Sequence, residues 1–158
     1  MYKIEIFEPR HQLELQKLIK AFKQFEGQYE PAFKLDNQSV EELYNVEMIG
    51  EGKYVYCARY EKEMVGFIAF EESFKNDPLI AENIPVVYIS ALFILEEHRS
   101  KGLAQRLMKL PEDFAKEKNI KFLKLLMFTK NQLARDFYFK WGFEDYESTM
   151  IKEIRLLN

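Results

Sequence analysis

The sequence predicts one α/β domain, residues 1–158, built on a mixed β-sheet. Three observations predict it. The chain has 158 residues, 47% of them apolar and 31% charged, which fits a single globular domain with a packed core. Short runs with strand-like alternation are interleaved with longer runs of helical spacing. Residues 86–128 read as a strand, a helix and a second strand, the order of a βαβ unit.

The first half of the chain predicts one strand and two helices. Residues 2–7 alternate with period two and predict a strand. Residues 11–26 place their apolar side chains on one helical stripe. Residues 39–49 open with Ser39 and Glu42, which have the spacing of a capping box, and predict a second helix.

Three strands follow in the middle of the chain. Residues 53–60 and 63–72 predict two strands joined by a short hairpin connection. Residues 73–85 contain two prolines and two asparagines without a clear period, so we expect a long loop there. Residues 86–95 are apolar on both faces, which is typical of a strand in the interior of a sheet.

The next helix and strand complete the βαβ unit. Residues 102–118 carry apolar side chains on one helical face. Pro111 lies inside this stretch, and because proline lacks a backbone donor we expect it to kink or restart the helix. Residues 120–128 predict another buried strand.

The last elements are a capped helix and a closing strand. Asn131 has the place of a helix N-cap and Gly142 that of a C-terminal stop. Residues 143–154 then predict one more strand. The predicted order is therefore β-α-α-β-β-β-α-β-α-β, without repeats or low-complexity tracts.

Charge and cysteine content exclude several classes of function. A formal net charge of −3 gives no indication of nucleic-acid binding. The single cysteine, Cys57, cannot form a disulfide within one chain and is expected to be a small core residue. The sequence shows no signal-peptide pattern and no apolar run of 18 residues, so we expect a cytoplasmic protein that does not bind membranes.

The turn at residues 96–104 joins a predicted strand to a predicted helix and has the properties of an anion site. The first amides of a helix lack internal acceptors, and the helix dipole adds partial positive charge. Gly102 lets an anion approach the backbone, and Arg99 and Lys101 add positive charge. The turn has neither the Gly-Lys-Ser/Thr order of a P-loop nor three spaced glycines. It therefore predicts a diphosphate site without magnesium and without a nicotinamide cofactor.

Two segments resemble one known family. Arg99–Ala104, Arg-Ser-Lys-Gly-Leu-Ala, resembles the Arg/Gln-x-x-Gly-x-Gly/Ala signature of the GNAT acyl-CoA N-acyltransferases. Residues 131–143 are similar to the family's Asn-x-x-Ala-x-x-Phe-Tyr-x-x-x-Gly-Phe segment. Each alone also fits a plain reading, a charged surface turn or an aromatic helix face, but their order and spacing agree with the family. The resemblance covers residues 53–154 well and residues 1–50 by element order.

The resemblance implies a GNAT fold, with a central mixed sheet of about six to seven strands flanked by about four helices. It implies acetyl-CoA as cosubstrate and no metal. In the family, the pyrophosphate lies on the turn amides and the pantetheine arm runs beside the interior strand. The implied cofactor-binding residues are Phe93, Ile94, Arg99, Ser100, Lys101, Gly102, Leu103, Ala104, Gln105, Asn131 and Tyr138.

The implied reaction is attack of a neutral amine on the thioester. Tyr138 matches the family's general acid, which protonates the leaving thiolate; the alternative is a core tyrosine. Many relatives carry a glutamate four residues before the position of Ile94, where this chain has Ser90. A water held by Ser90 is expected to relay the proton to Glu71 or Glu72, and Glu72 is the candidate base. A solvated strand end is the alternative for both glutamates.

The acceptor is expected to be a primary amine of a small molecule or a peptide. In the family, the first two helices and the loop after the third strand bind the acceptor, and here they are rich in aromatic and acidic residues, which suit a cation. The alternative is that most of the aromatic residues belong to the core and the acidic residues to a solvated face. The alternative function is a non-catalytic acyl-CoA-binding module of GNAT type. The resemblance also makes a homodimer plausible, although no residue points to one.

Overall fold

The computed structural model describes residues 1–75 and 84–157. Its contacts divide the chain into two compact units, Met1–Leu126 and Met127–Asn158, which are described separately below. That the chain forms one domain stays a prediction. None of the helices in the described ranges combines the length and the apolar character needed to cross a membrane.

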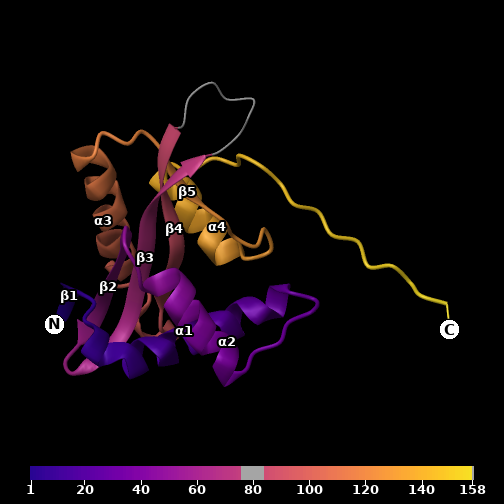
Figure 1. Cartoon of the computed structure of the whole chain (residues 1–158), viewed down its shortest axis with the longest axis horizontal. Coiled ribbons are helices and arrows are strands. Elements are labelled where there is room, and N and C mark those ends of the chain that lie inside the picture. Colours follow the sequence, from indigo (N-terminus) through magenta and orange to yellow (C-terminus); the bar gives the residue numbers. More distant parts are fainter. Residues whose placement is uncertain (76–83, 158) are drawn as a thin grey trace. The chain divides into compact units, whose positions relative to one another are not determined.

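The first unit is built on a five-stranded sheet with the strands in chain order (Figure 1). The three pairs formed by the first four strands are antiparallel, and the fifth strand is parallel to the fourth. The strands are β1 Tyr2–Ile6, β2 Lys53–Tyr60, β3 Glu63–Lys75, β4 Ile84–Ile94 and β5 Leu123–Leu125. The mixed α/β class is confirmed, and the described part of the chain has fewer strands than expected.

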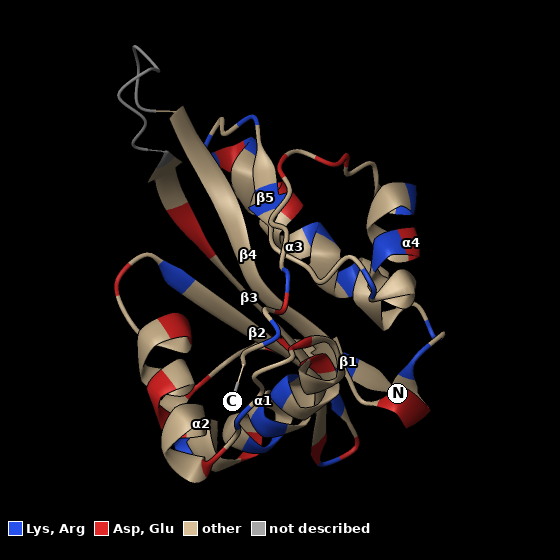
Figure 2. Cartoon of the chain, turned by 90° about the vertical axis from the view of Figure 1, so that its right-hand side faces the viewer, with Lys and Arg blue, Asp and Glu red and all other residues tan. Residues whose placement is uncertain are grey.

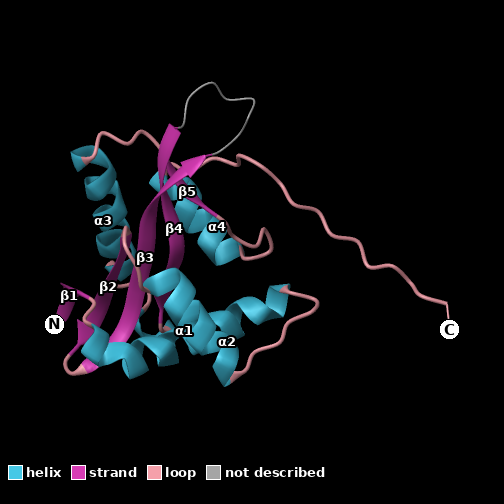
Figure 3. Ribbon diagram, in the orientation of Figure 1, coloured by secondary structure: helices cyan, strands magenta, loops and turns pink. Residues whose placement is uncertain are grey.

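Helices cover both faces of this sheet (Figure 3). On one face lie α1 Gln12–Glu26 and α2 Asn37–Leu43, with a further turn at Tyr44–Met48. The other face carries α3 Leu103–Glu117, whose Phe114 ring contacts aromatic rings of β2 and β3. The largest buried side chains come from both layers: Leu15, Ile19, Val65, Phe67, Ile68, Val87, Leu103, Leu107 and Met108.

Two predicted features of the helices are corrected. The N-cap of α2 is Asp36, whose carboxylate accepts hydrogen bonds from the backbone N–H and the hydroxyl of Ser39 at 2.8 Å each, so Ser39 is not the cap. Helix α3 runs through Pro111 without restarting. Pro111 is buried against the sheet layer, where its apolar ring offsets the lost backbone hydrogen bond.

Strand lengths also differ from the prediction. Strand β3 extends to Lys75 and β4 begins at Ile84, because residues 73–75 pair with residues 84–86. The rest of the predicted loop, residues 76–83, lies outside the described residues. The strand expected at 120–128 shrinks to β5, because only three of its residues pair with β4.

The second unit contains α4 Gln132–Trp141 and an extended segment after it. Asn131 is the N-cap, accepting from the Ala134 backbone N–H at 3.2 Å, and Gly142 ends the helix with φ 103°, so both caps are confirmed. The strand predicted at 143–154 is wrong: residues 143–157 form no helix or strand. Every residue from 144 to 157 is exposed.

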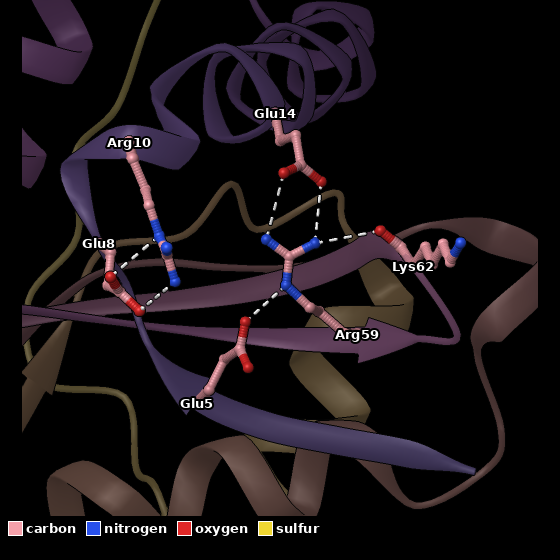
Figure 4. A network of polar contacts seen from close by, with 6 residues as sticks. All are labelled: Glu5, Glu8, Arg10, Glu14, Arg59 and Lys62. Atoms are coloured by element: carbon pink, nitrogen blue, oxygen red, sulfur yellow. Dashed lines mark hydrogen bonds and ion pairs between the residues drawn. The ribbon is translucent and has the colours of Figure 1, made fainter.

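An ionic network fastens α1 to the edge of the sheet (Figure 4). The guanidinium of Arg59 donates to both carboxylate oxygens of Glu14, at 2.9 and 3.1 Å, and to Glu5 at 2.5 Å. It also donates to the Lys62 carbonyl at 3.2 Å. Arg59 lowers the pKa of Glu14 through these hydrogen bonds, so the pair stabilises the fold above the acidic range.

Candidate active site

The turn after β4 has an unusual backbone path. Strand β4 ends at Ile94, a short 3-10 turn follows at Glu96–His98, and α3 begins at Leu103. Ser100 and Gly102 both have positive φ, 59° and 79°. A left-handed residue at the N-cap is natural for glycine, and a Cβ there would meet no atom within 4 Å. The backbone therefore turns toward open space at Gly102.

This turn presents a run of unpaired backbone donors. The first hydrogen bond of α3 runs from the Arg106 N–H to the Gly102 carbonyl at 3.2 Å. No described residue accepts a hydrogen bond from the backbone N–H groups of residues 100–105, and no side chain caps the helix. Unpaired donors at a helix N-terminus attract an anion. The residues needed for a diphosphate are therefore present and are not blocked by the protein's own carbonyls.

The side chains of the two basic residues of the turn donate hydrogen bonds to backbone carbonyls. Arg99 donates from Nε to the Ile94 carbonyl at 2.8 Å and lies 5.3 Å from the Phe25 ring centroid and 5.7 Å from that of Phe93. Lys101 donates to the Glu97 carbonyl at 3.1 Å. The anion site predicted at the turn therefore rests first on its backbone amides, as the sequence indicates, and the role of Arg99 and Lys101 stays a prediction.

In the described part of the first unit, half of β4 has no paired strand on the β5 side. Strand β5 pairs only with residues 87–89 of β4. The Leu95 N–H donates to the Val65 carbonyl on β3, so alternation directs the backbone groups of Leu92 and Ile94 away from β3. Within the first unit, this open edge of β4 leads directly to the amides of the turn. In Figure 2 the ribbon of β4 is uniformly tan, because none of its residues is charged.

Phe93 takes a different position from the one the sequence predicts. Its carbonyl oxygen would lie 2.9 Å from a Cβ on Gly66, so its backbone groups face β3 and not the open edge. The Phe93 side chain is buried and its ring lies 5.4 Å from that of Phe22 on α1. Ile94 and Leu92 therefore supply the backbone groups at the open edge, and Phe93 supplies apolar surface beside it.

A β-bulge marks the middle of β4. The pairing register with β3 shifts between Ala69 and Phe70, because Ala69 pairs with Ala91 and Phe70 with Ile89. Ser90 is the extra residue of the bulge. A bulge bends its strand and increases the local twist, so the strand direction of β4 changes at Ser90. Pairing with β5 stops at Ile89, immediately before this bulge.

The two candidate glutamates lie on opposite faces of β3. Glu71 shares the face of Phe67 and Ala69, which pack against α1 and α2. Glu72, which is exposed, shares the face of Phe70, which contacts α3. Sequence alone cannot separate neighbouring glutamates, because it does not show which face each helix covers.

A polar row crosses the sheet at Glu71. Lys53, Glu71, Tyr88 and Lys124 are successive cross-strand partners on β2, β3, β4 and β5. Nζ of Lys53 lies 3.8 Å from a carboxylate oxygen of Glu71. The pKa of Tyr88 is raised by burial and by the negative charges of Glu47 and Glu71. Tyr88 was not identified from the sequence, because the loop predicted at residues 73–85 concealed its register with Glu71.

Other residues near the turn and in the sheet have structural partners. His98 shares a 3.0 Å hydrogen bond between its Nδ1 and the Tyr2 hydroxyl, and its ring packs against the Tyr2 ring. Cys57 is buried, and burial raises the pKa of its thiol to about 12, as expected for a core residue. Asn131 and Tyr138 belong to the second unit. The half-buried Tyr138 ring contacts Phe137 and Phe143 at 5.4 and 5.5 Å, and its catalytic role stays a prediction.

Comparison with known proteins gives one family. A model of the Acetyltransferase (GNAT) family matches residues 15–143. Among curated proteins, an uncharacterized N-acetyltransferase from Archaeoglobus fulgidus is 34% identical over 84 residues, 53% of this chain and 55% of that protein. The chain thus spans about half the length of this curated relative.

Solved structures share the fold at low sequence identity. A tetramutant of the BH1408 protein from Bacillus halodurans has a TM-score of 0.81 and 17% identity, covering 96% of this chain and 99% of that chain. The enzyme AAC(6')-Iy, in complex with the bisubstrate analog CoA-S-monomethyl-acetylneamine, has a TM-score of 0.69 and 18% identity, covering 99% of both chains.

Proposed function

Because the chain belongs to the GNAT acetyltransferase family, we propose that it transfers an acetyl group from acetyl-CoA to a primary amine. The observation that carries the proposal is the run of unpaired amides at residues 100–105, placed where the open edge of β4 ends. The amides bind the pyrophosphate of the coenzyme. The backbone groups of Ile94 and Leu92 bind the pantetheine arm as an added strand would be bound.

Binding of the arm requires Arg99 to change partner. In the described structure the Arg99 guanidinium occupies the Ile94 carbonyl. An amide of the arm takes that acceptor, and Arg99 is then released toward the phosphates of the coenzyme. The free-energy cost of this exchange is small, because one hydrogen bond to the Ile94 carbonyl replaces another. The cation–π contacts with Phe25 and Phe93 keep the guanidinium nearby in the unbound chain.

The acceptor amine approaches from the face that carries α1 and α2. On the opposite face, α3 packs over β3, β4 and β5. On the α1 face the helix packs mainly over β3, and Glu71 and Tyr88 lie beside the open half of β4. Glu71 accepts the proton of the ammonium group, directly or through a water held at Ser90. An N–H of β4 stabilises the negative charge that develops on the thioester oxygen, and Tyr138 protonates the leaving thiolate.

The substrate class is a small-molecule amine or a peptide amine. Glu47 and Glu71, which face Tyr88, favour a cationic acceptor. The similar aminoglycoside N-acetyltransferase AAC(6')-Iy was solved with the bisubstrate analog CoA-S-monomethyl-acetylneamine, which supports a small-molecule acceptor. The replacement of a β4 glutamate by Ser90 favours the second candidate, a module that holds acyl-CoA without turnover.

Release of free thiol from acetyl-CoA in the presence of a panel of amines tests the proposal. We expect amine-dependent release, together with heat on titration of CoA into the protein and a rise in melting temperature. ATP and NAD serve as controls and should have no comparable effect. Binding of CoA without thiol release for any amine supports the non-catalytic module. Absence of both CoA binding and thiol release contradicts both candidates.

Replacing Gly102 by alanine tests the amide site. The φ of 79° strains any other residue by about 1–2 kcal/mol, and the added methyl narrows the approach to the amides. Gly52→Ala is the matched control, because Gly52 has φ 75° and equally open surroundings. We expect both variants to lose similar stability and only Gly102→Ala to lose CoA affinity, by about tenfold or more. Equal CoA affinity in the two variants, measured by calorimetry, contradicts the site.

A further inference from the structure

The turn that carries the unpaired amides has little backbone support of its own. No described residue accepts a hydrogen bond from the N–H groups of residues 100–105. Ser100 adopts φ 59°, a left-handed conformation that is costly for residues other than glycine. Residues 100–102 are also exposed. Contacts outside this segment must therefore hold the shape in which its amides face an anion.

Tyr2, on β1, contacts the chain on both sides of these amides. Its hydroxyl and the Nδ1 of His98, which precedes them, are hydrogen bonded at 3.0 Å. Its backbone carbonyl accepts from the guanidinium of Arg106, in the first turn of α3, at 3.4 Å. Between these two contacts, the ammonium of Lys101 lies 5.9 Å from the centre of the Tyr2 ring. One residue therefore spans the segment from its beginning to the start of the helix.

Tyr2 is itself fixed to the sheet. It pairs with Tyr60 on β2, and the centroids of the two rings lie 4.9 Å apart. The centroid of the His98 ring lies 5.7 Å from that of Tyr2 and 5.4 Å from that of Tyr60. Aromatic rings at these distances attract one another. The ring cluster of Tyr2, Tyr60 and His98 therefore connects the turn after β4 to the first two strands of the sheet.

The hydroxyl of Tyr2 adds direction to this connection. A phenylalanine would supply the same ring, but ring contacts allow neighbouring groups to slide, whereas a hydrogen bond depends on angle. The bond acts on His98, the last residue of the short 3-10 turn that directly precedes the amide segment. The backbone N–H of His98 in turn donates to the Leu95 carbonyl at 2.9 Å. The Tyr2 hydroxyl thus fixes the point from which the amide segment starts.

We propose that Tyr2 is a positioning residue of the coenzyme site and acts through its hydrogen bond to His98. The inference rests on the proposed binding of the CoA diphosphate at the amides of residues 100–105. The bond holds the start of the segment against the sheet, so the amides are directed outward before the diphosphate arrives. A site that is formed in advance loses less conformational freedom on binding, and removal of the bond therefore weakens CoA binding.

Calorimetric titration of CoA into wild type, Tyr2→Phe and Tyr60→Phe tests the positioning role. Tyr2→Phe removes only the hydroxyl, and we expect CoA affinity to fall by about three- to tenfold, the range of one net hydrogen bond. Tyr60→Phe removes a hydroxyl from the same ring cluster that no described residue binds, and should keep wild-type affinity. Equal affinity of Tyr2→Phe and wild type, or equal losses in both variants, overturns the positioning role. A wild-type chain that does not bind CoA overturns the proposed function as well.

Two further titrations separate positioning from a general loss of packing. 3′-Phospho-ADP, the half of CoA that contains the diphosphate, should lose affinity for Tyr2→Phe by the same factor as CoA. His98→Phe should reproduce the loss, and the double variant should bind no more weakly than either single variant, because each removes the same bond. Additive losses in the double variant, or unchanged affinity for 3′-phospho-ADP, overturn the proposal.

Discussion

Glu71→Gln is expected to lower kcat/KM by about 10²- to 10⁴-fold, the range of a lost general base, while Glu72→Gln leaves it nearly unchanged. The two residues are neighbours on β3 with the same side chain, but alternation places them on opposite faces of the sheet. Only Glu71 shares a face with Tyr88 beside the open half of β4. Glu72 lies on the face that carries α3, opposite to the face of Tyr88, so it is not beside the proposed path of the acceptor amine.

The amide of glutamine keeps the shape of the side chain and removes only its basicity. Folding should be preserved, because the contact of Glu71 with Lys53 is long, 3.8 Å, and partly exposed, so it contributes little to stability. Steady-state kinetics with the best amine of the panel, together with melting temperatures, measures the effect. Equal losses in both variants, or a loss in Glu72→Gln alone, would place the amine on the face of α3 and contradict the assignment.

Elements with a strong local pattern were predicted well from the sequence. The amphipathic stripe of α1 and the alternation of β2 are visible in short stretches of sequence. The predicted bounds of both elements agree with the structure within one residue. The caps at Asn131 and Gly142 are local as well. These features depend on neighbours in sequence, so sequence contains the necessary information.

Features that depend on distant partners were predicted poorly. Strand β5 pairs with only three residues of β4 and ends next to the Ser90 bulge, and no local pattern in residues 120–128 reveals that. The segment 143–154 was predicted to be a strand, yet it forms no strand in the described chain. Strand formation requires a second strand, so alternation alone predicts the capacity to pair and not the pairing itself.

The features of the candidate site also divide into those set by local sequence and those set by distant contacts. The glycine turn was predicted correctly, because a glycine between a strand and a helix is a local signal. The direction of Arg99 was not predictable, since it depends on the Ile94 carbonyl and on the Phe25 ring from α1. The choice between Glu71 and Glu72 depends on which helix covers which face. Long-range packing therefore decides the catalytic details that motif spacing leaves open.

Tyr138→Phe is expected to lower turnover by about 10²- to 10⁴-fold with nearly unchanged affinity for acetyl-CoA. A phenol with a pKa of about 10 protonates the departing thiolate, whose thiol has a pKa of about 8.5 in its unperturbed form. The substitution removes one hydroxyl and keeps the ring, so the ring contacts with Phe137 and Phe143 persist. Affinity for the coenzyme depends on the amides of residues 100–105 and should not change.

Phe143→Leu provides the matched control for Tyr138→Phe. It disturbs the same aromatic contact from the other side and leaves the hydroxyl in place. A general acid that acts on the leaving group predicts a large fall in kcat for Tyr138→Phe alone, at equal CoA affinity by calorimetry. It also predicts that acyl donors with a more acidic leaving thiol recover part of the lost rate, because they depart without protonation. Equal turnover of wild type and Tyr138→Phe removes the hydroxyl from the mechanism, and a similar fall in both variants assigns the tyrosine a packing role.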